Sequence, residues 1–68
     1  MEIEILRNKQ IFMGGELINV RLCKVPAPNE LFYYYTVNLF APGFINDTYS
    51  FPNYENALAE FNSTKEIP

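Results

Sequence analysis

Leu31-Phe32-Tyr33-Tyr34-Tyr35-Thr36-Val37-Asn38-Leu39-Phe40 is the stretch that decides the fold of this chain. Five of its ten residues are aromatic, and aromatic and β-branched residues favour strands. Apolar side chains occupy both alternating positions, so a strand here presents apolar surface on both sides. A chain of 68 residues has little material to cover two such surfaces. Either a second layer covers each face, or one face is the working surface of the protein.

The composition predicts one small domain over residues 1–64, with residues 65–68 as a loose tail. Hydrophobic residues make up 49% of the chain, which is too many for a disordered segment. Cys23 is the single cysteine and there is no histidine, so neither an internal disulfide nor a Cys/His zinc site is available. We therefore expect no metal and no cofactor, and stability that comes from packing or self-association.

Gly14-Gly15 predicts a tight two-residue turn between two strands. With Met13 opposite Glu16, the register sets Leu6 opposite Cys23. This register divides the hairpin into two faces. One face holds Ile3, Ile5, Ile11, Ile18, Val20 and Leu22, and the other holds Leu6, Phe12, Leu17 and Cys23 with Asn8, Gln10, Asn19 and Arg21. Arg7 and Lys9 fall on the apolar face, so we expect a bulge or break at Asn8-Lys9.

The remaining segments predict two further strands and a helix. Residues 31–40 form the third strand, 41–46 a loop around Pro42-Gly43, and 47–51 the fourth strand. Asn53 is a good helix N-cap, and the helix that follows is about nine residues long. Its apolar stripe consists of Tyr54, Ala57, Leu58 and Phe61. The predicted fold is α+β: a four-stranded, mainly antiparallel sheet in β-β-β-β-α order, with the C-terminal helix packed on one face.

One short helix covers one face of such a sheet, and the pattern leaves open which face it is. Either the Phe32/Tyr34/Phe40 set or the Leu31/Tyr33/Tyr35 set faces away from the helix. Tyrosine and phenylalanine are enriched in the cores of protein interfaces. The candidate partner-binding residues are therefore Phe32, Tyr33, Tyr34, Tyr35 and Phe40, with Glu30 and Asp47 at the rim.

The charge distribution narrows the class of partner. The net charge is −3, and residues 25–64 contain four acidic residues and no lysine or arginine. Phosphate neutralisation dominates nucleic-acid affinity, so stacked aromatics without cations argue against nucleic-acid binding. A negative field favours a protein partner with a basic surface. No apolar run approaches the ~20 residues of a membrane span, and the acidic N-terminus is unlike a signal peptide, so the expected location is cytoplasmic.

The sequence shows no constellation typical of an enzyme. Cys23 has no histidine to activate it, and Lys24 would point to the opposite face of the strand. The carboxylates lie in polar stretches typical of a solvated surface, so they do not suggest acid–base catalysis. We therefore expect no catalytic residues.

These observations favour a small acidic protein-binding module, an inhibitor or regulator that occludes a site on a partner protein. In size and charge the chain resembles the small inhibitors that phages and other mobile elements carry, such as anti-CRISPR and toxin-immunity proteins. The alternative hypothesis is a homodimeric structural component that uses the aromatic sheet face as its dimer seam.

Overall fold

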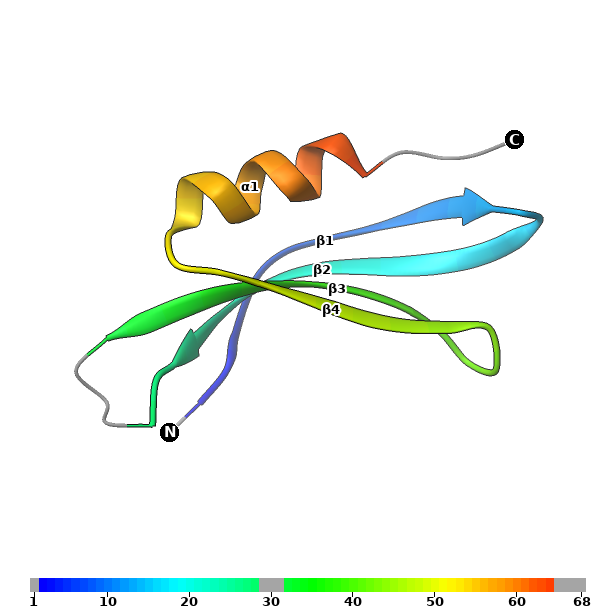
Figure 1. Ribbon diagram of the computed structural model, residues 1–68. Helices are drawn as coiled ribbons and strands as arrows, with labels where there is room; N and C mark the ends of the chain where they lie inside the picture. Colours follow the sequence, from blue (N-terminus) through cyan, green and yellow to red (C-terminus); the bar gives the residue numbers. More distant parts are fainter. Residues whose placement is uncertain (1, 29–31, 65–68) are drawn as a thin grey trace.

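The computed structural model describes residues 2–28 and 32–64 and shows a four-stranded sheet with one helix. The strands are β1 (Glu4–Met13), β2 (Glu16–Pro26), β3 (Tyr33–Ala41) and β4 (Ile45–Phe51), and the helix is α1 (Tyr54–Ser63). The sheet is antiparallel throughout, in the order β1-β2-β3-β4. Helix α1 lies over one face of it (Figure 1). The predicted fold is confirmed.

The hydrophobic core lies between α1 and the helix-covered face of the sheet. Its fully buried side chains include Val37 of β3, and Phe61 of α1 is 6% exposed. The other core members are Ile11, Ile18, Val20, Leu22, Leu39, Ala41 and Ala57. Tyr35 packs edge-on against Tyr54, with 5.8 Å between ring centroids. The odd-numbered residues of β3 therefore face the helix, which answers the question that the sequence left open.

A β-bulge at Leu6 divides β1 into two parts. Ile5 pairs with Cys23 and Arg7 pairs with Leu22, so Leu6 has no partner of its own. The register predicted from the Gly14-Gly15 turn is confirmed from Arg7 to Met13. It is wrong at Leu6, and the irregularity predicted at Asn8-Lys9 lies here instead. Two residues opposite one reverse the alternation of side chains, so Leu6 packs on the core.

The bulge also corrects the face predicted for the first residues of the chain. Because the alternation reverses at Leu6, Ile5 shares a face with Cys23 and not with Ile11. Ile3 and Ile5 are 64% and 54% exposed. These side chains lie on the side of the sheet that α1 does not cover.

Lys9 of β1 binds the C-terminal end of α1. Its Nζ donates hydrogen bonds to the backbone oxygens of Phe61 (2.6 Å) and Thr64 (2.7 Å), and it lies 4.6 Å from the centroid of the Phe61 ring. Arg7 Nε donates to the hydroxyl of Tyr54 at 3.4 Å. The last turn of α1 contains no basic residue. The two cations on the apolar face of β1 therefore meet the helix, and Lys9 complements the negative end of its dipole.

The boundaries of β4 and α1 follow from short local signals. The Phe44 amide donates to the Ala41 carbonyl at 3.0 Å, and Gly43 has φ +74°. This turn is shorter than the loop predicted over residues 41–46, so β4 begins at Ile45 and not at Asp47. The Asn53 side chain accepts a hydrogen bond from the Asn56 amide at 2.9 Å. The predicted N-cap is thus confirmed.

Candidate functional site

The candidate site is the face of the sheet opposite α1, which we call the uncovered face. Strand alternation and the register of the three strand pairs identify its members. They are Ile5, Asn8, Gln10 and Phe12 of β1; Leu17, Asn19, Arg21, Cys23 and Val25 of β2; Tyr34, Thr36, Asn38 and Phe40 of β3; and Asn46, Thr48 and Ser50 of β4.

One end of the uncovered face forms a shallow groove of about 450 Å³. Ile3, Ile5, Arg21, Cys23, Val25, Tyr34, Thr36, Asn38 and Thr48 line it. Because the bulge at Leu6 turns Ile3 and Ile5 outward, β1 supplies aliphatic side chains to this groove, and β3 supplies the half-buried ring of Tyr34. The groove is therefore apolar at its outer end and polar toward mid-strand, where Arg21, Asn38 and Thr48 line it.

A band of amide and hydroxyl side chains crosses the middle of the uncovered face. Gln10 Nε2 donates to Asn19 Oδ1 at 3.1 Å across β1 and β2. Asn38 Nδ2 lies within hydrogen-bonding distance of Thr48 Oγ1 (2.9 Å) and Asn46 Oδ1 (3.2 Å) on β4. Cross-strand bonds of this kind hold polar side chains in a defined orientation.

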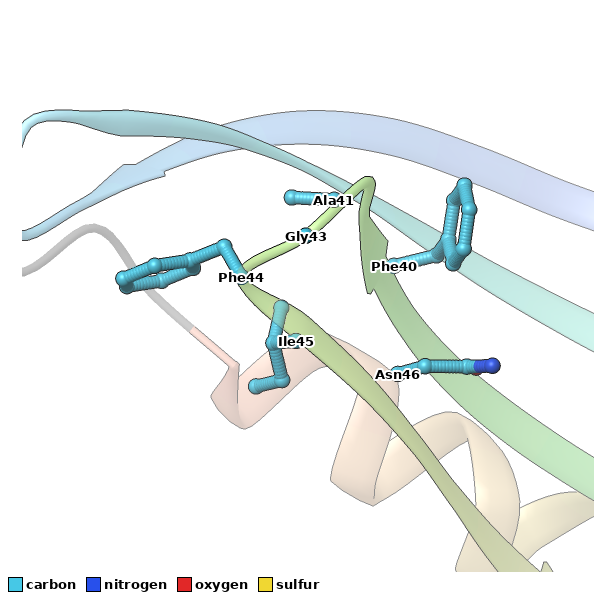
Figure 2. A pocket seen from close by; sticks show the side chains of 6 residues that line it. All are labelled: Phe40, Ala41, Gly43, Phe44, Ile45 and Asn46. Carbon is cyan, nitrogen blue, oxygen red and sulfur yellow. The ribbon is translucent and has the colours of Figure 1, made fainter.

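The turn end of the uncovered face is again apolar. Phe12 and Leu17 form a cross-strand pair, 54% and 44% exposed, and Phe40 lies beside them opposite Asn19. Figure 2 shows Phe40 and Asn46 extending to one side of the β3–β4 hairpin, with Ala41 and Phe44 on the other. These four residues, with Gly43 and Ile45, line a second hollow at the tip of the β3–β4 hairpin. This hollow takes residues from both sides of the sheet, so it is not part of the uncovered face.

Arg21 is the single charged side chain among the strand positions of the uncovered face. Its cross-strand neighbours are the neutral Asn8 and Asn38. The acidic strand residues Glu4, Glu16 and Asp47 pair with Lys24, Met13 and Leu39, which are positions on the helix-covered face. Glu55 and Glu60 belong to α1 itself. Among the described strand and helix residues, the negative charge thus lies on the helix side and the uncovered face carries a lone cation.

The structure divides the partner-binding residues that the sequence predicted. Tyr34 and Phe40 lie on the uncovered face, whereas Tyr35 and Asp47 lie on the helix-covered face. Tyr33 is also at a helix-side position, opposite Pro26, and Lys24 Nζ lies 4.1 Å from its ring centroid. Phe32, immediately before β3, is 66% exposed. Glu30 lies outside the described residues.

The site also contains residues that the aromatic run did not indicate. Phe12, Leu17 and Arg21 could be found from the hairpin register, which already set them on one face. Ile3 and Ile5 could not, because an alternating pattern continued without a bulge assigns them to the opposite side.

The described residues offer surfaces for binding, and no catalytic group is evident among them. Across residues 2–28 and 32–64, no three His, Cys, Asp or Glu side chains come together as a metal site requires. Cys23 is buried, and its cross-strand neighbours are Ile5 and Thr36. No helix in these ranges has the length and apolar character needed to cross a membrane. That the chain is not an enzyme stays a prediction.

Comparison with known proteins identifies no relative of this chain: no family model, no curated protein and no solved structure matches it.

Proposed function

We propose that this chain is a protein-binding module whose working surface is the uncovered face. The observation that carries the proposal is the apolar area left without a covering layer at both ends of that face. Ile5, Phe12 and Leu17 of the sheet, and Ile3 just before β1, are each close to half exposed or more. Exposed apolar patches that are rimmed by polar residues mark interaction sites.

The charge on the uncovered face specifies the partner more closely. A complementary surface would be apolar at two places and would carry a carboxylate able to reach Arg21, because a buried interface must pair its charges. Guanidinium–carboxylate pairs are strong and directional when both groups are fixed. This partner differs from the basic one expected from net charge, since the acidic residues of the strands and of α1 lie on the helix side.

Action by occlusion is the form of binding that this surface supports best. The uncovered face is built on hydrogen-bonded strands, so it can cover a site on a partner without rearranging. A domain of 7.9 kDa with such a face is suited to the role of an inhibitor or regulator.

Affinity capture with paired variants tests the proposal. Arg21→Glu and Tyr34→Ala alter the uncovered face, and Lys24→Glu and Phe44→Ala are the matched changes of charge and ring away from it. We expect the first two to reduce partner recovery about ten-fold or more, as hot-spot changes do, and the second two to leave it unchanged. Circular dichroism verifies that all four variants fold. Equal recovery by all four would remove the support for this face.

The alternative, a homodimer with the uncovered face as its seam, is less well supported. A two-fold axis through the middle of the face would bring two Arg21 side chains together without a carboxylate on that face to separate them. Like charges buried against each other oppose association.

A further inference from the structure

The β4 edge of the sheet carries only one of the features that keep strands from pairing with another chain, the charge of Asp47. β1 and β4 are the two edges. β1 is interrupted by its bulge and carries Arg7 and Lys9, which are devices that hinder edge pairing. β4 runs through seven unbroken pairs with β3 and contains no proline, lysine, glycine or bulge. Residues 46–50 are all exposed.

We propose that β4 pairs with β4 of a second copy of this chain, antiparallel and about a two-fold axis at Thr48. This axis sets Thr48 opposite Thr48 of the partner subunit and uses all seven residues of the strand. Ile45 then faces Phe51 of the partner subunit, beside the core that both residues already adjoin. Apolar cross-strand pairs of this kind are the unit that stabilises a sheet.

The same register keeps the Asp47 carboxylates of the two copies apart. It places Asp47 opposite Tyr49 of the partner subunit, and Asn46 opposite Ser50 of the partner subunit. An axis at Asp47 would set two carboxylates against each other, which destabilises a strand pair. An axis at Tyr49 would carry Ile45 past the end of the partner's strand and set Asp47 opposite Phe51 of the partner subunit. Of the three axes, only the one at Thr48 pairs Ile45 with Phe51 of the partner subunit and also keeps Asp47 away from a second carboxylate and from Phe51 of the partner subunit.

Pairing of β4 with β4 also closes the assembly. An isologous contact about a two-fold axis ends at two copies, whereas β4 pairing with β1 would build a ring or a filament. The dimer is a continuous eight-stranded sheet with both helices on one side and both uncovered faces on the other. The seam touches the uncovered face only along β4, at Asn46, Thr48 and Ser50, and leaves Arg21 and the apolar residues of β1 and β2 free. The two proposals can therefore fail separately.

Disulfide trapping tests the register directly in a Cys23→Ala background. Under the proposal, the Cβ atoms of two Thr48→Cys residues lie about 4.5–5.5 Å apart, near the spacing that a disulfide bridges. Asn46→Cys and Ser50→Cys are matched controls on the same side of β4. Each would lie roughly 13 Å from its own copy and directly opposite the other.

We expect rapid dimer formation for Thr48→Cys, little for either control alone, and mixed dimers when the two controls are combined. Absence of a Thr48→Cys dimer would overturn the proposal. Equal trapping of all three single variants would do the same, because random collision would then explain it.

The mass in solution provides an independent measurement. Light scattering of the unmodified chain in the upper micromolar range should give twice 7.9 kDa. Thr48→Lys sets two ammonium groups opposite each other and should return the mass to 7.9 kDa, whereas Gln10→Lys on β1 should not. A monomeric unmodified chain would contradict the proposal. So would a dimer that Arg21→Glu dissociates and Thr48→Lys does not, because that result places the seam on the uncovered face.

Discussion

Lys9 shows how one residue that conflicts with the hydrophobic pattern can hold two elements together. The pattern puts a lysine on the face of β1 that packs on the core, where a free charge would be costly. The structure pairs its ammonium group with two carbonyl oxygens at the end of α1 and with the Phe61 ring. The last carbonyls of a helix have no partner within the helix, so Lys9 acts as a C-cap donated from the sheet.

Replacement of this ammonium group should cost more stability than replacement of another lysine near an aromatic ring. We expect Lys9→Met to lower the free energy of unfolding by about 2 kcal/mol, since hydrogen bonds to charged groups contribute that much. Lys24→Met, which removes a cation–π contact with Tyr33, should cost about 0.5 kcal/mol. Urea unfolding followed by circular dichroism measures both. Equal losses would show that Lys9 contributes no more than an exposed side chain.

Among the elements, β1 is the one whose structure depends most on a single insertion. The bulge lets Leu6 and Ile11 share the core although they are an odd number of positions apart. It also turns Ile3 and Ile5 toward the opposite side, where they line the groove. The bulge therefore places Leu6 beside the core and Ile3 and Ile5 in the candidate site.

A comparison of neighbouring truncations in β1 tests the position of the bulge. Leu6→Ala should destabilise the protein by about 1–2 kcal/mol, less than for a fully buried leucine because Leu6 is only partly covered. Ile5→Ala should cost at most about 0.5 kcal/mol, as expected for a surface position. A continuous register without the bulge would reverse this order, so urea midpoints for the two variants decide between the registers.

The elements also show which parts of the structure were predictable from the sequence. Turn chemistry at Gly14-Gly15 and alternation defined the hairpin register from Arg7 onward, and the stripe from Tyr54 to Phe61 defined the helix. A bulge or break in β1 was predicted, but its position at Leu6 was not, because alternation treats Leu6 and Ile5 as equally good core residues. The aromatic run located β3 but could not say which of its faces met the helix, since both are apolar. The sequence therefore indicated only part of the candidate site. Among the residues that it singled out, Tyr34 and Phe40 lie on the uncovered face, and Tyr35 and Asp47 do not.

The whole molecule is a two-layer structure in which a single helix completes the core. A helix of ten residues is too short to persist alone in water, so it depends on docking. Ala57 and Phe61 are its buried members, and Phe61 also receives the Lys9 contact. We therefore expect the sheet and the helix to unfold together.

Removal of the Phe61 ring should unfold most of the population. Truncation of a buried phenylalanine costs about 3–5 kcal/mol, which is comparable with the whole stability of a domain of this size, about 3–5 kcal/mol. Phe44→Ala removes a ring that is 52% exposed and should cost less than about 1 kcal/mol. Thermal unfolding of both variants measures the contrast. A Phe61→Ala variant with native helix content would contradict the dependence of the sheet on α1.

The contact between Lys9 and Phe61 has a kinetic consequence. The two residues are 52 positions apart in the chain, whereas the β1–β2 and β3–β4 hairpins close through short turns. We expect a contact at such separation to form late, after the local pairings have brought its partners near. Interactions absent from the folding transition state retard unfolding and barely alter the folding rate. Lys9 should therefore act mainly on the lifetime of the folded molecule, and stopped-flow unfolding of Lys9→Met would show it as a faster unfolding limb with an unchanged folding limb.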